Sequence, residues 1–431
     1  MTKIKLSQEQ ESVRQAIEGS EEHWFITGKA GTGKSALLQE FRKRTSKNVV
    51  VSASTGIAAL NVTGNTLHRL VGVGTAIPAD LGIDLPKVRQ KRQHLKNVDT
   101  IIIDEISMVS ADLLDACDRT LRYITGRRND PFGGIQIVMF GDPYQLPPVT
   151  TNEVKRFYKQ QGYRSPWFFD AHVWEDTEFN TVELQHIFRQ SDPTFKNLLN
   201  VVRDGTATED DVKLLNVLGG RTGKSDDAVL LATTNKLVDD HNRKNLAKLR
   251  GRTHVYNARV NTGFGRDEPA PRRLDLKVGA HVMMLNNDKT DRWVNGSRGV
   301  IENLHADSIT VRMDESGEAY SVGFHAWVPD GTDPEGYKSA PKFWQIPVKL
   351  AWAVTIHKSQ GLSLPEIEIN LGDNGAFADG QTYVALSRVT NPAGMYLSAP
   401  LSMSDIRVDP DVKRFFKALE EIEEEAFETS E

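Results

Sequence analysis

The 431-residue sequence has one cysteine, no long apolar run and little net charge. Because Cys117 is the only cysteine, an internal disulfide is excluded and a reducing compartment is expected. No apolar run approaches the ~20 residues of a membrane-spanning helix, and residues 1–5 hold no apolar signal core. These absences predict a protein without membrane contact that is cytoplasmic in a bacterium or phage-infected cell, or nuclear or mitochondrial in a eukaryote. In its helical stretch, Cys117 is expected to be a small core residue rather than a reactive thiol.

The net charge of −5 also shows no excess of basic residues. It argues against a nucleic-acid binder that uses its whole surface, but a local basic channel is still compatible with it. Hydrophobic residues make up 39% of the chain and charged residues 26%, as in globular proteins. A chain of this length exceeds one ordinary core, so two to four domains are expected.

The acidic residues concentrate near the end, at residues 420–425. From Pro410 onward, apolar side chains recur at helical spacing between glutamates. The pattern predicts a docked amphipathic helix with a solvated acidic face, and a surface for a protein partner is the alternative. The apolar positions are Phe415, Leu419, Ile422 and Ala426.

A glycine-rich segment, GKAGTGKS at residues 28–35, matches the phosphate-loop pattern. An apolar run precedes it and a helical pattern follows it, which is the context the motif requires. Its glycines let backbone N–H groups turn toward phosphate oxygens at a helix N-terminus. Lys34 is expected to reach the β- and γ-phosphates, and the Ser35 hydroxyl to hold Mg²⁺. The residues assigned to nucleotide binding are Gly28, Lys29, Ala30, Gly31, Thr32, Gly33, Lys34 and Ser35.

The first half of the chain alternates apolar runs with helical patterns. Near-continuous apolar strands between helices predict a parallel sheet covered on both faces. Ligands of such sheets bind beyond the carboxyl ends of the strands, where polar residues of this chain occur. The expected strands are residues 25–27, 49–51, 101–103 and 135–140.

A second alternating region begins near Glu183, with a strand at 229–232 and a helix over 236–249, and resumes at Val348. Short β-like runs separated by Asn, Asp, Gly and Pro lie between its two parts and predict an inserted β-rich domain. The predicted division is a first α/β domain over 1–185 with an insertion at about 70–98, a second over 186–250 and 346–405, the β domain over 251–345, and a tail over 406–431.

Two strands of the first domain are followed by residues suited to phosphate chemistry. Asp104 is placed to bind Mg²⁺ through water, and Glu105 to polarise the attacking water. Gln145 follows the next strand and is expected to hydrogen-bond the γ-phosphate and that water. Arg189 and Arg388 suit the charge of a transferring phosphoryl group, but either alone also fits a surface residue.

The order of these motifs resembles that of superfamily 1 helicases. They are GKAGTGKS, IIIDEISM, GDPYQLPPV, FRQSD, TIHKSQG and GQTYVALSR. Three further segments resemble the Pif-type ("petite integration frequency") DNA helicases of superfamily 1B, relatives of RecD. They are residues 112–136, the β-rich segments 276–285 and 295–297, and residues 6–10.

The resemblance implies two RecA-like domains with parallel sheets, a small wedge insertion and an inserted SH3-like β domain. It also implies that Gln10 contacts adenine and that Arg189 and Arg388 are arginine fingers. Lys34, Asp104, Glu105 and Gln145 are then the other catalytic residues, with ATP and Mg²⁺ as cofactors. Single-stranded DNA would contact Thr55, Gly56, Thr66, His68, Asn235, Thr355, His357 and Lys358.

The function implied is that of an ATP-dependent DNA helicase that moves 5′ to 3′ on single-stranded DNA and unwinds duplexes. Its partners would be single-stranded DNA and duplex junctions, and it is expected to be a monomer. G-quadruplexes and RNA–DNA hybrids are further substrates of interest. An RNA translocase and a nucleotide-dependent binding module without unwinding are the alternatives. Basic residues 87–96 fit either a wedge at the duplex junction or a solvated helix, and residues 314–337 are expected to form an extension.

Overall fold

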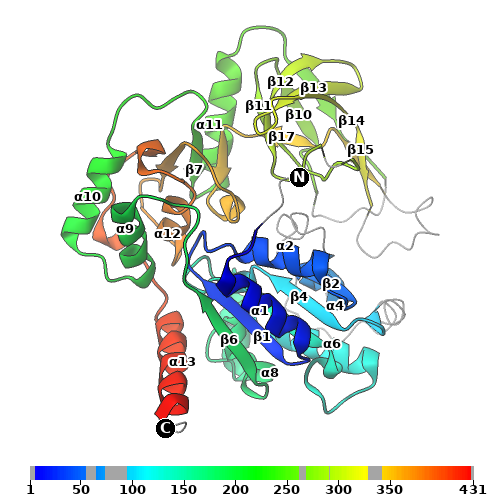
Figure 1. Ribbon diagram of the computed structural model, residues 1–431. Helices are drawn as coiled ribbons and strands as arrows, with labels where there is room; N and C mark the ends of the chain where they lie inside the picture. The colour runs from blue at the N-terminus through cyan, green and yellow to red at the C-terminus, as the bar shows by residue number, and fades with distance from the viewer. Residues whose placement is uncertain are drawn as a thin grey trace. The chain divides into compact units, whose positions relative to one another are not determined.

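The computed structural model describes residues 5–54, 65–72, 95–261, 268–290, 292–328 and 342–428. The chain divides into two units, which Figure 1 draws together. Unit 1 comprises Met1–Thr222, Ser363–Pro365 and Asp373–Glu431, and unit 2 comprises Gly223–Leu362 and Glu366–Gly372. Among the described residues, none of the helices combines the length and apolar character needed to span a membrane.

Unit 1 holds most of the helices and one large sheet. Its helices are α1 (Gln8–Gly19), α2 (Lys34–Arg44), α4 (Leu67–Val71), α6 (Ala111–Thr125), α7 (Asn152–Gln161), α8 (His172–Glu175), α9 (Pro193–Asp204), α10 (Glu209–Gly219), α12 (Gln381–Leu386) and α13 (Pro410–Glu428). Its 3-10 turns are η1 (Ile106–Met108), η2 (Pro131–Gly134), η3 (Phe168–Asp170), η6 (Pro392–Gly394) and η7 (Met403–Asp405). Its strands are β1 (His23–Gly28), β2 (Val49–Ala53), β3 (Asn65–Thr66), β4 (Thr100–Asp104), β5 (Gln136–Phe140), β6 (Phe179–Leu184) and β20 (Met395–Leu397).

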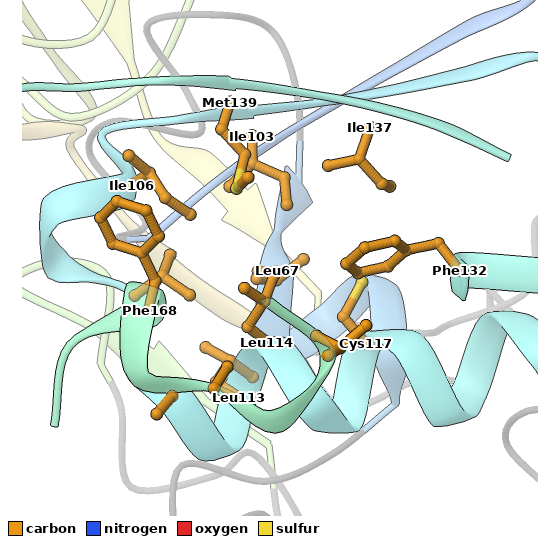
Figure 2. Packing of buried hydrophobic residues seen from close by; sticks show 14 of the residues in the cluster. Leu67, Ile103, Ile106, Leu113, Leu114, Cys117, Phe132, Ile137, Met139 and Phe168 are labelled. Atoms are coloured by element: carbon orange, nitrogen blue, oxygen red, sulfur yellow. The ribbon is translucent and has the colours of Figure 1, made fainter. Parts of the chain in front are cut away.

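The large sheet has the strand order β3-β2-β4-β5-β1-β6, and its strands are parallel. Both faces are covered, as the apolar runs predict. On one face, Ile26, Ile102 and Val138 pack with α1 and α2. On the other, Ile103 and Met139 pack with α6 and the turns that follow it (Figure 2). The expected α/β class with a parallel sheet is therefore confirmed.

Cys117 lies in α6 and belongs to the same apolar cluster as Leu114 and Phe132 (Figure 2). It is fully buried, and burial together with Asp118 raises the pKa of its thiol. A buried thiol with a raised pKa is a poor nucleophile, so the interpretation as a core residue is confirmed.

The C-terminal helix α13 packs onto the cluster around α6. Val412 and Phe415 are buried there, and the Phe415 ring stacks on Phe169 with 4.3 Å between centroids. The expected docked helix is thus present. Ile422 does not belong to its packed face, contrary to the helical spacing, because it is 62% exposed.

Unit 2 combines parallel strands with antiparallel sheets. Its parallel strands have the order β18-β7-β19, and a five-stranded antiparallel sheet has the order β14-β13-β12-β11-β17. The first set is β7 (Val229–Ala232), β18 (Ala353–Thr355) and β19 (Ile367–Asn370), with helix α11 (Asn235–Lys248) and turn η5 (His357–Ser359). The antiparallel strands are β8 (His254–Asn257), β9 (Arg259–Val260), β10 (Arg273–Leu276), β11 (His281–Met284), β12 (Arg298–Leu304), β13 (Ser308–Met313), β14 (Ala319–Gly323), β15 (His325–Trp327), β16 (Phe343–Gln345) and β17 (Val348–Leu350).

Two details of unit 2 differ from the sequence-based expectation. Val348–Leu350, expected to resume the second α/β domain, pairs with β11 in the antiparallel sheet. Part of the expected extension at 314–337 is the edge strand β14, which pairs with β13, and residues 329–337 lie outside the described residues. Most of the wedge segment 70–98 also lies outside them, although Leu70, Val71 and Leu95 are buried in the α6 cluster.

Stability should fall on mild acidification because of His23 in β1. Its Nδ1 accepts a hydrogen bond from the Ile137 N–H at 3.0 Å, which requires a neutral ring, and burial lowers its pKa to about 4. The unfolded pKa is about 6.5, so the unfolded chain binds more protons between these values and stability is lost as the pH falls. From pH 7 to pH 5 we expect a loss of about 2 kcal/mol.

This loss is measured as the change in unfolding free energy or thermal midpoint with pH. His23→Asn keeps an acceptor oxygen and should remove most of the dependence of stability on pH. His254→Asn is the control, because His254 is exposed, and it should keep that dependence. An identical pH profile for His23→Asn and the wild type would contradict the assignment.

Candidate nucleotide and DNA-binding site

The segment between β1 and α2 has the backbone shape of a phosphate cradle. Gly28, Gly31 and Gly33 have φ values of 139°, 87° and 81°, which side-chain-bearing residues rarely adopt. A Cβ on Gly28 would lie 2.7 Å from the Leu184 carbonyl oxygen, so the start of the loop passes close to the end of β6. The Lys34 ammonium donates to the carbonyls of Gly28 and Lys29. With α2 beginning at Lys34, the loop presents N–H groups at a helix N-terminus.

Gln10 lies against this loop. Its Nε2 donates to the Thr32 carbonyl at 3.0 Å, and its Oε1 accepts from the Ser7 N–H at 2.9 Å in a capping box at the start of α1. The side chain is buried. The amide therefore links the start of α1 to the loop, and the adenine contact expected for Gln10 stays a prediction.

Two acids follow β4 at the carboxyl edge of the sheet. Asp104 is buried, and burial together with Glu105 raises its pKa to about 7. Within the described part of the chain Asp104 forms no salt bridge, and its Oδ1 accepts the Glu105 N–H at 3.0 Å. Glu105 has a φ of 52°, a left-handed backbone conformation that is unusual for a residue with a side chain.

A buried carboxyl group at a strand end beside a phosphate cradle fits a site for Mg²⁺. This ion is usually held by one or two carboxylates together with substrate phosphates and water. Asp104 and the exposed Ser35 at the start of α2 supply that donor set. Among the described residues there is no cluster of three or more His, Cys, Asp or Glu that could hold a metal.

Gln145 follows β5 in a turn closed by its N–H and the Asp142 carbonyl at 2.9 Å. The side chain is buried, and its Nε2 lies 3.5 Å from the Asp142 Oδ2. Burial lowers the pKa of the Lys34 ammonium, and the charges of Asp142 and Glu105 oppose that shift. The polar residues after β4 and β5 thus share one electrostatic environment with Lys34.

Both predicted arginines lie in unit 1 beside the loop. The Phe188 N–H donates to the Gly31 carbonyl at 2.8 Å, and a Cβ on Gly31 would lie 2.5 Å from the Arg189 Cβ. The Arg189 Nη1 donates to the Ser387 carbonyl at 3.0 Å. Arg388 follows Ser387 and is fully buried, and burial together with Arg189 lowers its pKa to about 9. It stays charged at neutral pH in an environment that favours an anion nearby.

Tyr383 is a contact of the phosphate loop that the sequence analysis did not single out. Its hydroxyl accepts the Ala30 N–H at 2.7 Å, and the ring is buried. It lies in α12, on the segment that carries Arg388. The neighbouring α12 cap residue Gly380 approaches so closely that a Cβ there would lie 2.3 Å from the Gln145 carbonyl oxygen.

Phe188 is a second residue that the sequence analysis missed. Its ring is 52% exposed and lies 3.6 Å from the position of a Cβ on Gly33, beside Gln10 and next to the His186 ring. An exposed aromatic ring beside a phosphate loop is a natural surface for a purine base. Its position directly before Arg189 could have identified it, but the sequence analysis considered only the charged residue of this segment.

The DNA contacts expected in unit 1 lie partly outside the described residues, as Thr55 and Gly56 do. Thr66 ends β3, the edge strand of the sheet, in register with Ala53 of β2. His68 follows in α4, and burial lowers the pKa of its ring. Both described residues therefore lie at the carboxyl edge of β2 and β3.

The contacts expected in unit 2 lie at the carboxyl edge of its parallel strands. Thr355 ends β18 in register with Ala232 of β7, and α11 begins at Asn235 shortly after β7. The Thr355 Oγ1 accepts the Lys358 N–H at 3.3 Å, which holds η5 against the strand end. His357, the first residue of η5, is partly buried, and burial lowers its pKa.

Lys349 in β17 adds a positive charge that the sequence analysis missed. Burial and the nearby charge of Lys358 lower its pKa to about 8. Two lysines close enough to repel each other form a favourable place for a phosphate group.

Comparisons with known proteins agree with this arrangement. Residues 5–213 match the family model "PIF1-like helicase", and residues 266–304 match "DNA helicase Pif1, 2B domain". The chain is 35% identical to the ATP-dependent DNA helicase Pif1 of Bdellovibrio bacteriovorus over 97% of its own length and 93% of that protein. It is 35% identical to human ATP-dependent DNA helicase PIF1 over 97% of its length but spans only 64% of that protein.

A solved structure of the Pif1 helicase from Bacteroides in complex with ADP-AlF3 and single-stranded DNA is also similar. It superposes with a TM-score of 0.80 at 35% identity, over 97% of this chain and 98% of that one.

The close approach of α12 to Gln145 predicts that Gly380→Ala impairs ATP turnover. The added Cβ would overlap the carbonyl oxygens of Tyr144 and Gln145, so backbone has to move at the site. We expect a fall in the ATPase kcat of about 10-fold or more, since small displacements of catalytic groups are costly. Gly162→Ala is the matched control, because Gly162 has a similar φ of 84° with no atom near its Cβ position. Equal ATPase rates in the two variants would contradict the prediction.

Proposed function

Because the chain belongs to the family of Pif1-like DNA helicases, we propose that it is an ATP-driven motor that moves 5′ to 3′ on single-stranded DNA and unwinds duplexes. The observation that carries the proposal is the buried cluster in unit 1, where the phosphate loop, Asp104, Gln145 and two arginines adjoin. A cluster that combines a phosphate cradle with carboxylates and arginines suits phosphoryl transfer. The wedge and the domain division proposed from the sequence, apart from the placement of residues 348–350, are part of the same hypothesis.

In this proposal each residue of the cluster has one role. Lys34 binds the β- and γ-phosphates, and Ser35 and Asp104 hold Mg²⁺, which neutralises phosphate charge when bound. Glu105 polarises the attacking water, and Gln145 orients it. Arg189 and Arg388 act as arginine fingers; the contact of the Arg189 backbone with Gly31 and the hydrogen bond of its guanidinium to Ser387, which precedes Arg388, support this assignment.

DNA binding is proposed for the carboxyl edges of both sheets. Short polar side chains there, such as Thr66, Asn235 and Thr355, suit contacts with sugars and phosphates that carry no sequence information. Lys358 and Lys349 add the positive charge such contacts need. The Bacteroides relative was solved with single-stranded DNA, which supports this class of partner. G-quadruplexes and RNA–DNA hybrids are finer proposals, as is action as a monomer.

Polarity and substrate class are tested by strand displacement. A duplex with a 5′ single-stranded tail should be unwound in the presence of ATP and one with only a 3′ tail should not, and Lys34→Ala should abolish both ATP turnover and unwinding. The same assay with RNA strands separates a DNA motor from an RNA translocase. Unwinding of the 3′-tailed duplex alone would refute the polarity, and ATP-dependent binding without displacement would favour the binding-module alternative.

Phe188 is proposed to stack on the adenine base, with Gln10 holding the loop beside it. Phe188→Ala should raise the KM for ATP about 10-fold with a smaller effect on kcat, since base–aromatic stacking is worth ~1–3 kcal/mol. Phe188→Tyr keeps a ring and should behave as the wild type. An unchanged KM in Phe188→Ala would remove Phe188 from the site.

A further inference from the structure

Arg203, at the end of α9, carries a buried charge that the proposed mechanism does not use. It is 4% exposed, although arginine is seldom buried without a role. Its Nη2 lies 3.1 Å from the Asp142 Oδ1 and 3.2 Å from the Glu183 Oε1, and its Nη1 lies 3.2 Å from Asp204. Asp142 is the most buried of these carboxylates. Burial opposes the charge on Arg203, but Asp142 and its neighbours more than compensate, so its pKa is raised.

Asp142 is the link between Arg203 and Gln145. The Asp142 Oδ1 accepts from Arg203 and from the Tyr144 N–H at 3.2 Å, while its Oδ2 faces the Gln145 Nε2 at 3.5 Å and its carbonyl closes the turn. A fully buried carboxylate turns toward its strongest cation partner, because an unpaired charge there is costly. The guanidinium therefore determines which way the Asp142 oxygens point, and one of them, Oδ2, accepts the hydrogen bond from the Gln145 amide.

Two aromatic rings hold the guanidinium itself in place. The Arg203 Cζ lies 4.3 Å from the centroid of the Tyr144 ring and 5.7 Å from that of Phe416. The rings stack with 4.9 Å between centroids and 24° between planes. Tyr144 directly precedes Gln145, and Phe416 belongs to α13. A planar guanidinium suits such a surface, and a lysine ammonium does not reproduce its two-sided hydrogen bonding.

We propose that Arg203 is a positioning residue for ATP hydrolysis, which fixes Asp142 and through it the orientation of Gln145, with Phe416 of α13 as its outer support. The inference rests on the proposed function, because Gln145 matters only if the chain hydrolyses ATP. It gives the C-terminal helix a part in turnover that its packing alone does not require. The charges of Asp142 and Arg203 also act on Lys34: Asp142 raises the pKa of its ammonium group, and Arg203 lowers it.

The test measures kcat and KM for DNA-stimulated ATP hydrolysis in purified full-length variants. Arg203→Lys keeps the charge but loses the planar, bidentate contact, and should lower kcat about 10- to 100-fold with the KM for ATP within two-fold. Phe416→Leu should lower kcat by a smaller factor, about 3- to 10-fold. Arg414→Gln is the matched control, because it removes another Arg–Asp pair, that with Asp170, and should leave kcat unchanged.

A double-mutant cycle separates positioning from general stability. If Arg203 acts through Gln145, then Arg203→Lys should cause little further loss of kcat in a Gln145→Ala background. Additive losses would overturn the route through Gln145, and a kcat of Arg203→Lys within two-fold of the wild type would overturn the positioning role. The thermal midpoint of each variant is measured as well. If kcat falls across the variants only in proportion to the thermal midpoint, Arg203 stabilises the fold and does not position Gln145.

The wild-type measurement distinguishes failure of this inference from failure of the proposed function. Without ATP hydrolysis by the wild type, the proposed function itself fails. With DNA-stimulated hydrolysis in the wild type and unchanged kcat in both Arg203→Lys and Phe416→Leu, only the inference about Arg203 fails. Should Arg203→Lys not fold, Phe416→Leu carries the test alone, because it leaves every charge in place.

Discussion

Charge buried around the phosphate loop is the constraint on which the rest of unit 1 depends. Asp104 and Asp142 are buried carboxylates at adjacent strand ends, and the loop segment contributes the Lys34 ammonium, whose charge acts on both of them. Ionised groups removed from water are stable only when they are paired and hydrogen-bonded. Further cations come from much later in the chain: Arg203 on α9 pairs with Asp142, and the charges of Glu105 and Asp142 act on Arg388 after α12. The packing of these distant segments against the candidate nucleotide site therefore depends on the pairing of its buried charges.

This dependence links the site to the C-terminal helix. Phe415 of α13 packs in the apolar cluster beneath the sheet, and the next residue, Phe416, lies against Arg203 and Tyr144. Trp167 donates its indole N–H to Asp409 at 2.9 Å just before the helix, which anchors its start. The helix thus contacts both the core and the turn that carries Gln145. The acidic composition of its sequence predicts only a solvated face and gives no sign of this contact.

Much of the fold could be predicted because buried parallel strands leave a strong pattern. The runs at 101–103 and 229–232 became β4 and β7, since strands covered on both faces must be apolar throughout. The edge strand β14 was missed because a strand with one open side tolerates the Gly- and Asp-rich composition typical of loops. For β17, the apolar residues suited either neighbouring sheet, and only its pairing with β11 decided between them.

The sequence by itself determined which residues carry the proposed chemistry, because the phosphate loop, Asp104 and Glu105 are local motifs set by their own spacing along the chain. Only the tertiary structure decided what surrounds them. Tyr383 on the Ala30 N–H, Phe188 beside Gly33 and Arg203 on Asp142 join residues that are far apart in sequence. Such contacts arise when the folded chain must pair buried charges and N–H groups, and no local pattern encodes which distant residue will do so.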